Sequence, residues 1–141
     1  MLYDPRLVQP MRDELTRLGV RELRTSDEVD EAFEADGETL VVVNSVCGCA
    51  ARNARPAVAM AMNHDGKQPD RVVTVFAGQD VEATARARQY FTGVRPSSPS
   101  LALLSNGELQ FMLERHQIEG REARDIAADL TKAYDRYCAT S

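Results

Sequence analysis

The sequence predicts an α/β fold with a mixed central β-sheet flanked by helices on both faces. Strand and helix patterns alternate along the chain, which favours parallel strands joined by helical crossovers. Leu40–Val43 is an unbroken apolar run and Arg71–Phe76 is rich in β-branched residues, as in strands covered on both faces. Asn106-Gly107 predicts a tight hairpin, so the last two strands are expected to be antiparallel.

The first part of the chain predicts a helix, a short strand and a second helix. Asp4 is a helix N-cap followed by a proline, and Gly19 ends the helix. The residues expected on its buried face are Leu7, Met11, Leu15 and Leu18. A short strand at 20–24 follows, and Thr25 with Glu28 forms a capping box that starts the second helix.

The remaining elements continue this alternation. They are expected as a buried strand at 39–44, a helix up to about Asn63, a buried strand at 71–76, a helix at 80–91, hairpin strands at 100–104 and 108–114, and a long helix after Gly120. Pro56 lies inside the helix that ends near Asn63, where a proline removes a hydrogen bond and kinks the chain. No repeat or linker divides the sequence, so residues 1–141 are predicted to form one domain.

Composition and charge exclude several classes of protein. The 141 residues are 43% hydrophobic and 28% charged, which is an ordinary globular balance. The longest apolar run, 57–62, is far shorter than the roughly 20 residues of a membrane-spanning helix. The N-terminus lacks the basic and apolar stretches of a signal peptide. A net charge of −5 without a Lys/Arg block argues against binding to nucleic acid or to an anionic membrane.

Cysteine usage predicts a reducing compartment and a reactive dithiol. The chain has three cysteines, an odd number without an export signal, which argues against a secreted disulfide framework and for a cytoplasmic location. Cys47-Gly48-Cys49 directly follows the buried strand and precedes a helix. The helix N-terminus stabilises a thiolate over a thiol there, and the thiolate is the attacking species in thiol–disulfide exchange.

The spacing of the two cysteines separates their roles. Within a regular helix, residues two apart point to nearly opposite sides, so a bond between Cys47 and Cys49 requires Cys47 to lie before the first turn. Such a small ring is expected to be strained, and a strained disulfide does not persist. We therefore predict Cys47 as the exposed nucleophile and Cys49 as the residue that resolves its mixed disulfide.

Two other interpretations of the pair are open. The cysteines would pack as small hydrophobes, or they would bind a soft metal or cluster together with Cys138, His64 or His116. None of these residues has a recognisable zinc spacing, so no metal site is predicted. His116 is expected to make a structural hydrogen bond rather than to shuttle protons. Cys138 is expected to be buried or half-exposed, which leaves pairing between chains, and thus a homodimer, open.

Pro99 is the second proline of structural interest. It lies in the segment Pro96-Ser97-Ser98-Pro99-Ser100, which leads directly into the first hairpin strand. Proline at the start of a strand is usually an edge or turn residue in the trans form. A cis Ser98–Pro99 bond is the alternative, because cis bonds in folded proteins are confined almost wholly to X–Pro. These residues alone leave both forms open.

Four segments together carry a resemblance to a known family. They are Pro5 with Met11-Arg12-Asp13-Glu14-Leu15, Asn44-Ser45-Val46-Cys47-Gly48-Cys49-Ala50, Arg95-Pro96-Ser97-Ser98-Pro99-Ser100 and Glu114-Arg115-His116-Gln117-Ile118-Glu119-Gly120. With these segments the chain resembles the bacilliredoxin family over nearly its whole length. The resemblance implies a thioredoxin-like fold in which Cys-Gly-Cys replaces Cys-x-x-Cys.

The resemblance also implies an activity, namely the removal of bacillithiol, a low-molecular-weight thiol, from mixed disulfides on oxidised proteins. Cys47 corresponds to the attacking cysteine, Cys49 to the second one, and Pro99 to the cis-proline that lies beside the reactive sulfur and helps hold the substrate backbone. The implied partners are bacillithiolated client proteins and the small thiol, which is a co-substrate, with no bound cofactor. A general protein disulfide isomerase or reductase is the alternative activity.

Candidate substrate-binding residues follow from the chemistry of this thiol. Bacillithiol carries carboxylates, so a cationic neighbour of the dithiol is expected. Arg52 and Arg55 follow the dithiol in the same helix, Arg95 opens the Ser-Pro-Ser segment, and Ser98 precedes Pro99. For each arginine, the alternative is an ordinary solvated surface residue.

Overall fold

Helices and strands alternate along the chain in the computed structural model, which describes residues 2–139. The elements are α1 (Pro5–Thr16), β1 (Arg21–Glu22), α2 (Ser26–Glu34), β2 (Glu38–Asn44), a π-helical turn η1 (Ala50–Ala54), α3 (Arg55–Met62), β3 (Arg71–Phe76), α4 (Val81–Gln89), β4 (Ser100–Ser105), β5 (Glu108–Leu113), α5 (Arg115–Ile118) and α6 (Ala123–Tyr137). The predicted domain also includes Met1 and residues 140–141, which lie outside the described residues.

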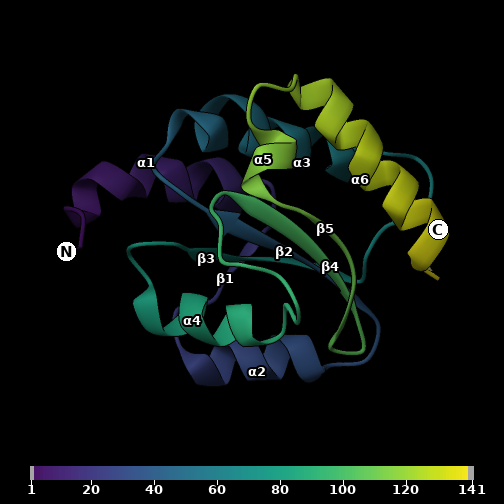
Figure 1. Ribbon diagram of the computed structural model, residues 1–141, viewed down its shortest axis with the longest axis horizontal. Coiled ribbons are helices and arrows are strands. Elements are labelled where there is room, and N and C mark those ends of the chain that lie inside the picture. Colours follow the sequence, from purple (N-terminus) through teal and green to yellow (C-terminus); the bar gives the residue numbers. More distant parts are fainter. Residues whose placement is uncertain (1, 140–141) are drawn as a thin grey trace.

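A mixed five-stranded sheet in the order β1-β3-β2-β4-β5 lies between two layers of helices. Strand β2 pairs with β3 in parallel and with β4 antiparallel, and β4 pairs antiparallel with β5. In Figure 1, helices α1, α3, α5 and α6 cover one face of the sheet, and α2 and α4 cover the other. The predicted α/β class, with helices on both faces of a mixed sheet, is confirmed.

The central strand shows why the apolar run folds as it does. Every residue of β2 is buried, because the strand has a neighbour on each side and a helical layer on each face. Side chains alternate across the sheet, so Leu40 and Val42 join the core beneath α3 and α6. Val41 and Val43 join the second core, which packs against α2 and α4.

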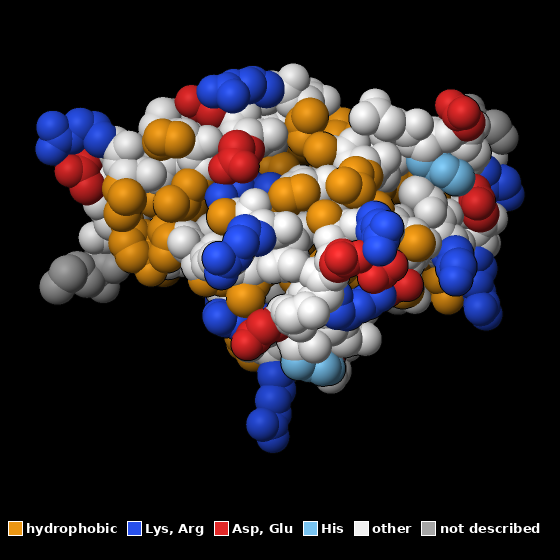
Figure 2. Space-filling model, turned by 90° about the horizontal axis from the view of Figure 1, so that it is seen from above, with side chains coloured by type: hydrophobic (Ala, Val, Ile, Leu, Met, Phe, Trp, Pro, Cys, Tyr) orange, Lys and Arg blue, Asp and Glu red, His pale blue; other side chains and the backbone are white. Residues whose placement is uncertain are grey.

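The buried face of α1 differs from the predicted one. Its buried residues are Val8, Arg12 and Leu15, whereas Leu7 is 52% exposed. The reason is that the Arg12 guanidinium donates to both carboxylate oxygens of Asp80, at 2.8 and 2.7 Å, and so turns a charged residue inward. Apolar side chains gather instead on the surface near the start of the chain (Figure 2), where Leu2, Tyr3 and Leu7 are the exposed large apolar residues.

The helix that follows the dithiol changes its hydrogen-bonding pattern where the sequence places a proline. In η1, the N–H of Arg55 donates to the carbonyl of Ala50, five residues earlier. Pro56 has no backbone N–H and so cannot donate the next helical hydrogen bond after that turn. It lies in the first turn of α3, where a helix does not need a backbone N–H donor. The expected interruption of the helix therefore takes the form of a π-helical turn, which is a frequent feature of functional sites.

The hairpin forms as predicted, and a short helix that the sequence did not predict follows it. Asn106 and Gly107 have φ angles of 50° and 83°, which suit a two-residue turn between β4 and β5. Glu114 and Gln117 then form a capping box that starts α5. Among the described residues, no helix is long and apolar enough to cross a bilayer.

Candidate active site

The dithiol lies where the buried central strand β2 gives way to a helix. The carbonyl of Cys47 accepts hydrogen bonds from the N–H groups of Ala50 and Ala51, at 3.1 and 3.3 Å. The N–H of Cys47 donates to the hydroxyl of Ser45 at 3.1 Å. Cys47 therefore lies just before the helical segment, and Cys49 lies within its first turn. Both are free thiols and partly exposed, so solvent and substrates can reach them.

The two thiols differ in acidity. Partial burial by itself raises the pKa of Cys47, but the Ser45 hydroxyl, the N–H groups of Ala50 and Cys49, and the charge of Arg115 together lower it below its usual value. Burial and the negative charge of Cys47 raise the pKa of Cys49. Cys47 is therefore the first of the pair to ionise, and Cys49 keeps its proton while Cys47 is a thiolate.

A buried arginine holds the end of β2 in place from behind the dithiol. Arg55 donates to the side-chain oxygen of Asn44 at 2.9 Å and to the carbonyl of Ser45 at 3.1 Å. Its Nε donates to Glu14 at 3.0 Å. The Arg55 side chain is 3% exposed, so it cannot reach a ligand at the surface. The prediction that Arg55 binds substrate is therefore corrected, because this residue supports the strand end.

Arg115 is a site residue that sequence reasoning missed. Its Nη2 lies 3.8 Å from Sγ of Cys49, and its Nη1 donates to the carbonyl of Ser98 at 3.2 Å. Its Nε donates to Glu119 at 3.1 Å. One guanidinium thus joins the dithiol to the loop before β4. The one sign of it in the sequence is its place next to His116 in the Glu114–Gly120 segment.

The loop before β4 contains a cis Ser98–Pro99 peptide bond, the form that the family resemblance implies. Ser100 pairs with Val43 in the sheet, so Pro99 lies at the same end of the sheet as the strand that leads into Cys47. The N–H of Arg115 donates to the hydroxyl of Ser97 at 3.3 Å, which further ties this loop to α5. Ser98 itself is half-buried and contributes its carbonyl to Arg115.

The two remaining candidate arginines occupy different environments. Arg52 folds back over Gly48, where a Cβ would lie only 2.7 Å from the Arg52 Nη2, so glycine leaves the guanidinium its place beside the dithiol. Arg95 is exposed and makes no hydrogen bond or ion pair within residues 2–139. The structure therefore places Arg52 against Gly48 of the Cys-Gly-Cys segment and leaves Arg95 as a solvated residue of the cis-proline loop.

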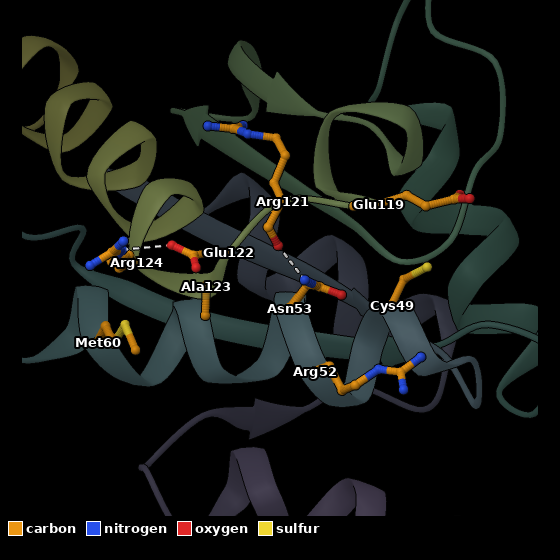
Figure 3. Close-up of a pocket in the computed structure, with 10 residues that line it drawn as sticks. Cys49, Arg52, Asn53, Met60, Glu119, Arg121, Glu122, Ala123 and Arg124 are labelled. Atoms are coloured by element: carbon orange, nitrogen blue, oxygen red, sulfur yellow. Dashed lines mark hydrogen bonds and ion pairs between the residues drawn. The ribbon is translucent and has the colours of Figure 1, made fainter.

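A groove of about 850 Å³ opens beside Cys49, between the η1–α3 helix and the loop that joins α5 to α6. Figure 3 shows Cys49, Arg52 and Glu119 at one end of it and Met60 and Arg124 at the other. The side-chain amide of Asn53 donates to the carbonyl of Arg121 and so connects the two walls.

The third cysteine and the exposed histidine take no part in this arrangement. Cys138 is 3% exposed. Burial and then the negative charges of Glu38 and Asp70 raise its pKa to about 12. It is therefore not placed to pair with another chain. His116 is exposed and makes no hydrogen bond within residues 2–139, so its prediction as a structural hydrogen-bonding residue is wrong. Within the same residues, no three His, Cys, Asp or Glu side chains lie together as metal ligands.

Solved structures confirm the fold. A thioredoxin from Malassezia sympodialis superimposes with a TM-score of 0.59 at 16% identity, over 85% of this chain and 91% of that one. A thioredoxin variant from Halobacterium salinarum gives a TM-score of 0.57 at 20% identity, over 86% of this chain and 92% of the other. The protein therefore belongs to the thioredoxin-fold class, and it carries a partly exposed dithiol at the end of its central strand.

Sequence comparisons narrow this class to one family. The family model described as disulphide isomerase matches residues 3–138. A bacilliredoxin from Salinibacter ruber is 58% identical over 98% of this chain and 82% of that protein. A bacilliredoxin from Halalkalibacterium halodurans is 57% identical over 94% of this chain and 91% of that protein. The chain belongs to the bacilliredoxin family.

The position of Arg115 leads to a prediction about acidity. We expect Arg115→Gln to raise the pKa of both thiols, because it removes a positive charge that favours both thiolates. Glu119→Gln is expected to lower the pKa of Cys49, because the Glu119 carboxylate raises it. Thiolate absorbance against pH, measured in Cys49→Ala and Cys47→Ala backgrounds, reads each sulfur separately. Unchanged titration curves in the Arg115→Gln protein would contradict the role of the Arg115 charge in the acidity of the two thiols.

Proposed function

We propose that this protein removes bacillithiol from mixed disulfides on oxidised client proteins, with Cys47 as the attacking and Cys49 as the resolving cysteine. The observation that carries the proposal is the unequal environment of the two thiols at the end of β2. Hydrogen bonds from the Ser45 hydroxyl and from backbone N–H groups stabilise the Cys47 thiolate, whereas burial and the charge of Cys47 raise the pKa of Cys49. Membership of the bacilliredoxin family supports bacillithiol as the thiol that is removed.

The proposed cycle begins with the Cys47 thiolate attacking the bacillithiol sulfur of the mixed disulfide. A bond forms between these sulfurs, and the client leaves as its thiolate, which takes up a proton. Cys49 then loses its proton and attacks Sγ of Cys47, so bacillithiol leaves as a thiolate and the Cys47–Cys49 disulfide forms. A thiol reductant returns this disulfide to the dithiol. Alternatively, a second bacillithiol attacks the adduct, which yields bacillithiol disulfide and frees Cys47.

The surrounding residues have proposed roles in the same reaction. Pro99 and Ser98, at the cis-proline loop, are proposed to lie along the client backbone beside Cys47. Arg52 is proposed to face the small thiol, and Arg95 is the more distant cationic candidate. Bacillithiol acts as a co-substrate and no bound cofactor is required for sulfur exchange. The cytoplasm, where thiols are kept reduced, is the proposed location.

A second candidate activity is general isomerisation or reduction of protein disulfides, which the description of the matching family model favours. The two activities differ in the substrate that is preferred rather than in the attacking atom. Rates on one client protein that carries bacillithiol, glutathione or an internal disulfide separate them. Bacilliredoxin activity requires the bacillithiol adduct to react fastest, and equal rates on all three would favour the general activity.

A trapping experiment tests the roles of the two cysteines. We expect Cys49→Ala, incubated with a bacillithiolated client and no free thiol, to accumulate one bacillithiol on Cys47, because the resolving thiol is missing. Intact-protein mass spectrometry with peptide mapping measures the adduct. Cys47→Ala under the same conditions is expected to stay unmodified. An adduct on Cys49 in the Cys47→Ala protein, formed as fast, would reverse the assignment.

A further inference from the structure

The groove beside Cys49 has the size of a small-molecule site. Its volume of about 850 Å³ lies within the range of roughly 300–1,000 Å³ that is usual for ligand pockets. One wall is the η1–α3 helix, which carries Cys49, Arg52 and Asn53, and the other is the loop that begins at Glu119. The hydrogen bond from Asn53 to the carbonyl of Arg121 holds the walls together across the middle.

The charged side chains of this groove are not equally available to a ligand. Arg121 is paired with Asp129 at 2.7 Å, and Arg124 is paired with Glu122 at 2.7 Å. In contrast, Arg52 makes no ion pair or hydrogen bond with any described residue, and its guanidinium lies over Gly48. Among the arginines that line the groove, Arg52 therefore offers an unpaired guanidinium, and it lies over Gly48, the residue between the two cysteines.

Polar acceptors complement this cation. The side-chain oxygen of Asn53 points toward the Cys49 end of the groove, while its nitrogen is used by the Arg121 carbonyl (Figure 3). Glu119 lies at the same end, where it accepts from Arg115. A carboxylate would find a bidentate donor in Arg52, and hydroxyl or amine groups of the same ligand would find acceptors in Asn53 and Glu119.

We propose that this groove is the binding site for the small-thiol half of the mixed disulfide, and that Arg52 binds a carboxylate of that thiol. The ligand class is a low-molecular-weight thiol that carries carboxylates, and the inference rests on the proposed function for the identity of bacillithiol. The client half lies on the other side of the dithiol, along Pro99. The adduct on Cys47 thus keeps its small thiol in the groove, next to Cys49, after the client has left.

The test compares a charged and an uncharged thiol on one client protein with a single cysteine. Its mixed disulfides with bacillithiol and with 2-mercaptoethanol are reduced by wild-type protein, Arg52→Gln and Arg52→Lys. We expect Arg52→Gln to lower kcat/KM on the bacillithiol adduct about tenfold, because a charge-assisted contact to the carboxylate is lost. The 2-mercaptoethanol adduct is expected to change by less than about twofold, and Arg52→Lys to retain part of the difference.

A matched control removes the same charge elsewhere. Arg136 is exposed on the last turn of α6, outside the groove. Arg136→Gln is expected to leave the rates on the bacillithiol and 2-mercaptoethanol adducts unchanged. Equal losses on both adducts in Arg52→Gln would show that Arg52 acts on the dithiol and would overturn the inference, as would no loss on either. A wild-type protein that does not favour bacillithiol over glutathione contradicts the proposed function instead, so the two failures are distinguishable.

Discussion

Replacing Cys47 with serine is expected to lower the rate of release of bacillithiol from a client protein by at least about a thousandfold, as loss of a nucleophile does in enzymes with covalent intermediates. The serine hydroxyl remains protonated in the environment that lowers the pKa of the Cys47 thiol, and it is a poor nucleophile toward sulfur. The measurement is the rate at which the bacillithiolated client disappears, followed by mass spectrometry with free bacillithiol as the reductant.

The other two cysteines provide controls for this variant. Cys49→Ser is expected to keep the first sulfur exchange, because the attacking thiolate is intact. Cys138→Ala is expected to keep the full cycle, since this residue is buried in the core beneath α6. If Cys47→Ser retained the activity while Cys49→Ser lost it, the attacking sulfur would be Cys49.

The second large effect is on stability. We expect Arg12→Met to lower the free energy of unfolding by about 3–5 kcal/mol, because it leaves the Asp80 carboxylate buried without its partner. The two side chains of this pair are 6% and 9% exposed, and the guanidinium also lies 5.2 Å from the centre of the Phe76 ring. Urea denaturation at neutral pH measures the loss as a change in midpoint at constant slope.

A second ion pair of the same chemistry serves as the control. Arg86 and Asp30 connect α4 to α2, but their side chains are 36% and 33% exposed. Arg86→Met is therefore expected to lower the free energy of unfolding much less than Arg12→Met does, because water screens an exposed ion pair. Equal losses in the two variants would mean that burial does not govern the strength of the Arg12 pair. Partial recovery in Arg12→Met combined with Asp80→Asn is expected, since the uncompensated charge is then removed.

Much of the fold was predictable because it depends on local patterns. The apolar run of β2, the turn residues Asn106 and Gly107, and the helical spacing before Tyr137 all act over a few neighbouring residues. The dithiol was predictable for the same reason, because its position between a strand and a helix is a property of adjacent residues.

The roles of the arginines were not predictable from such patterns. Arg115 lies 66 positions from Cys49, and Arg55 is 41 positions from Glu14. An isolated arginine in a sequence gives no sign of whether its guanidinium is paired, buried or free. Arg52 and Arg55 are only one helical turn apart, yet Arg52 lies over Gly48 and Arg55 supports the strand end.

The sequence by itself determined the α/β class, the order of the elements apart from the short helix α5, and the position of Cys47 and Cys49 between a strand and a helix, because hydrophobic periodicity and turn chemistry depend on neighbouring residues. Only the tertiary structure decided that the Ser98–Pro99 bond is cis, that Arg115 joins this loop to the dithiol, and that Arg52 is the unpaired cation of the groove. These features depend on which distant side chains the folded sheet and helices bring within hydrogen-bonding distance, and charge and burial at the site follow from those contacts.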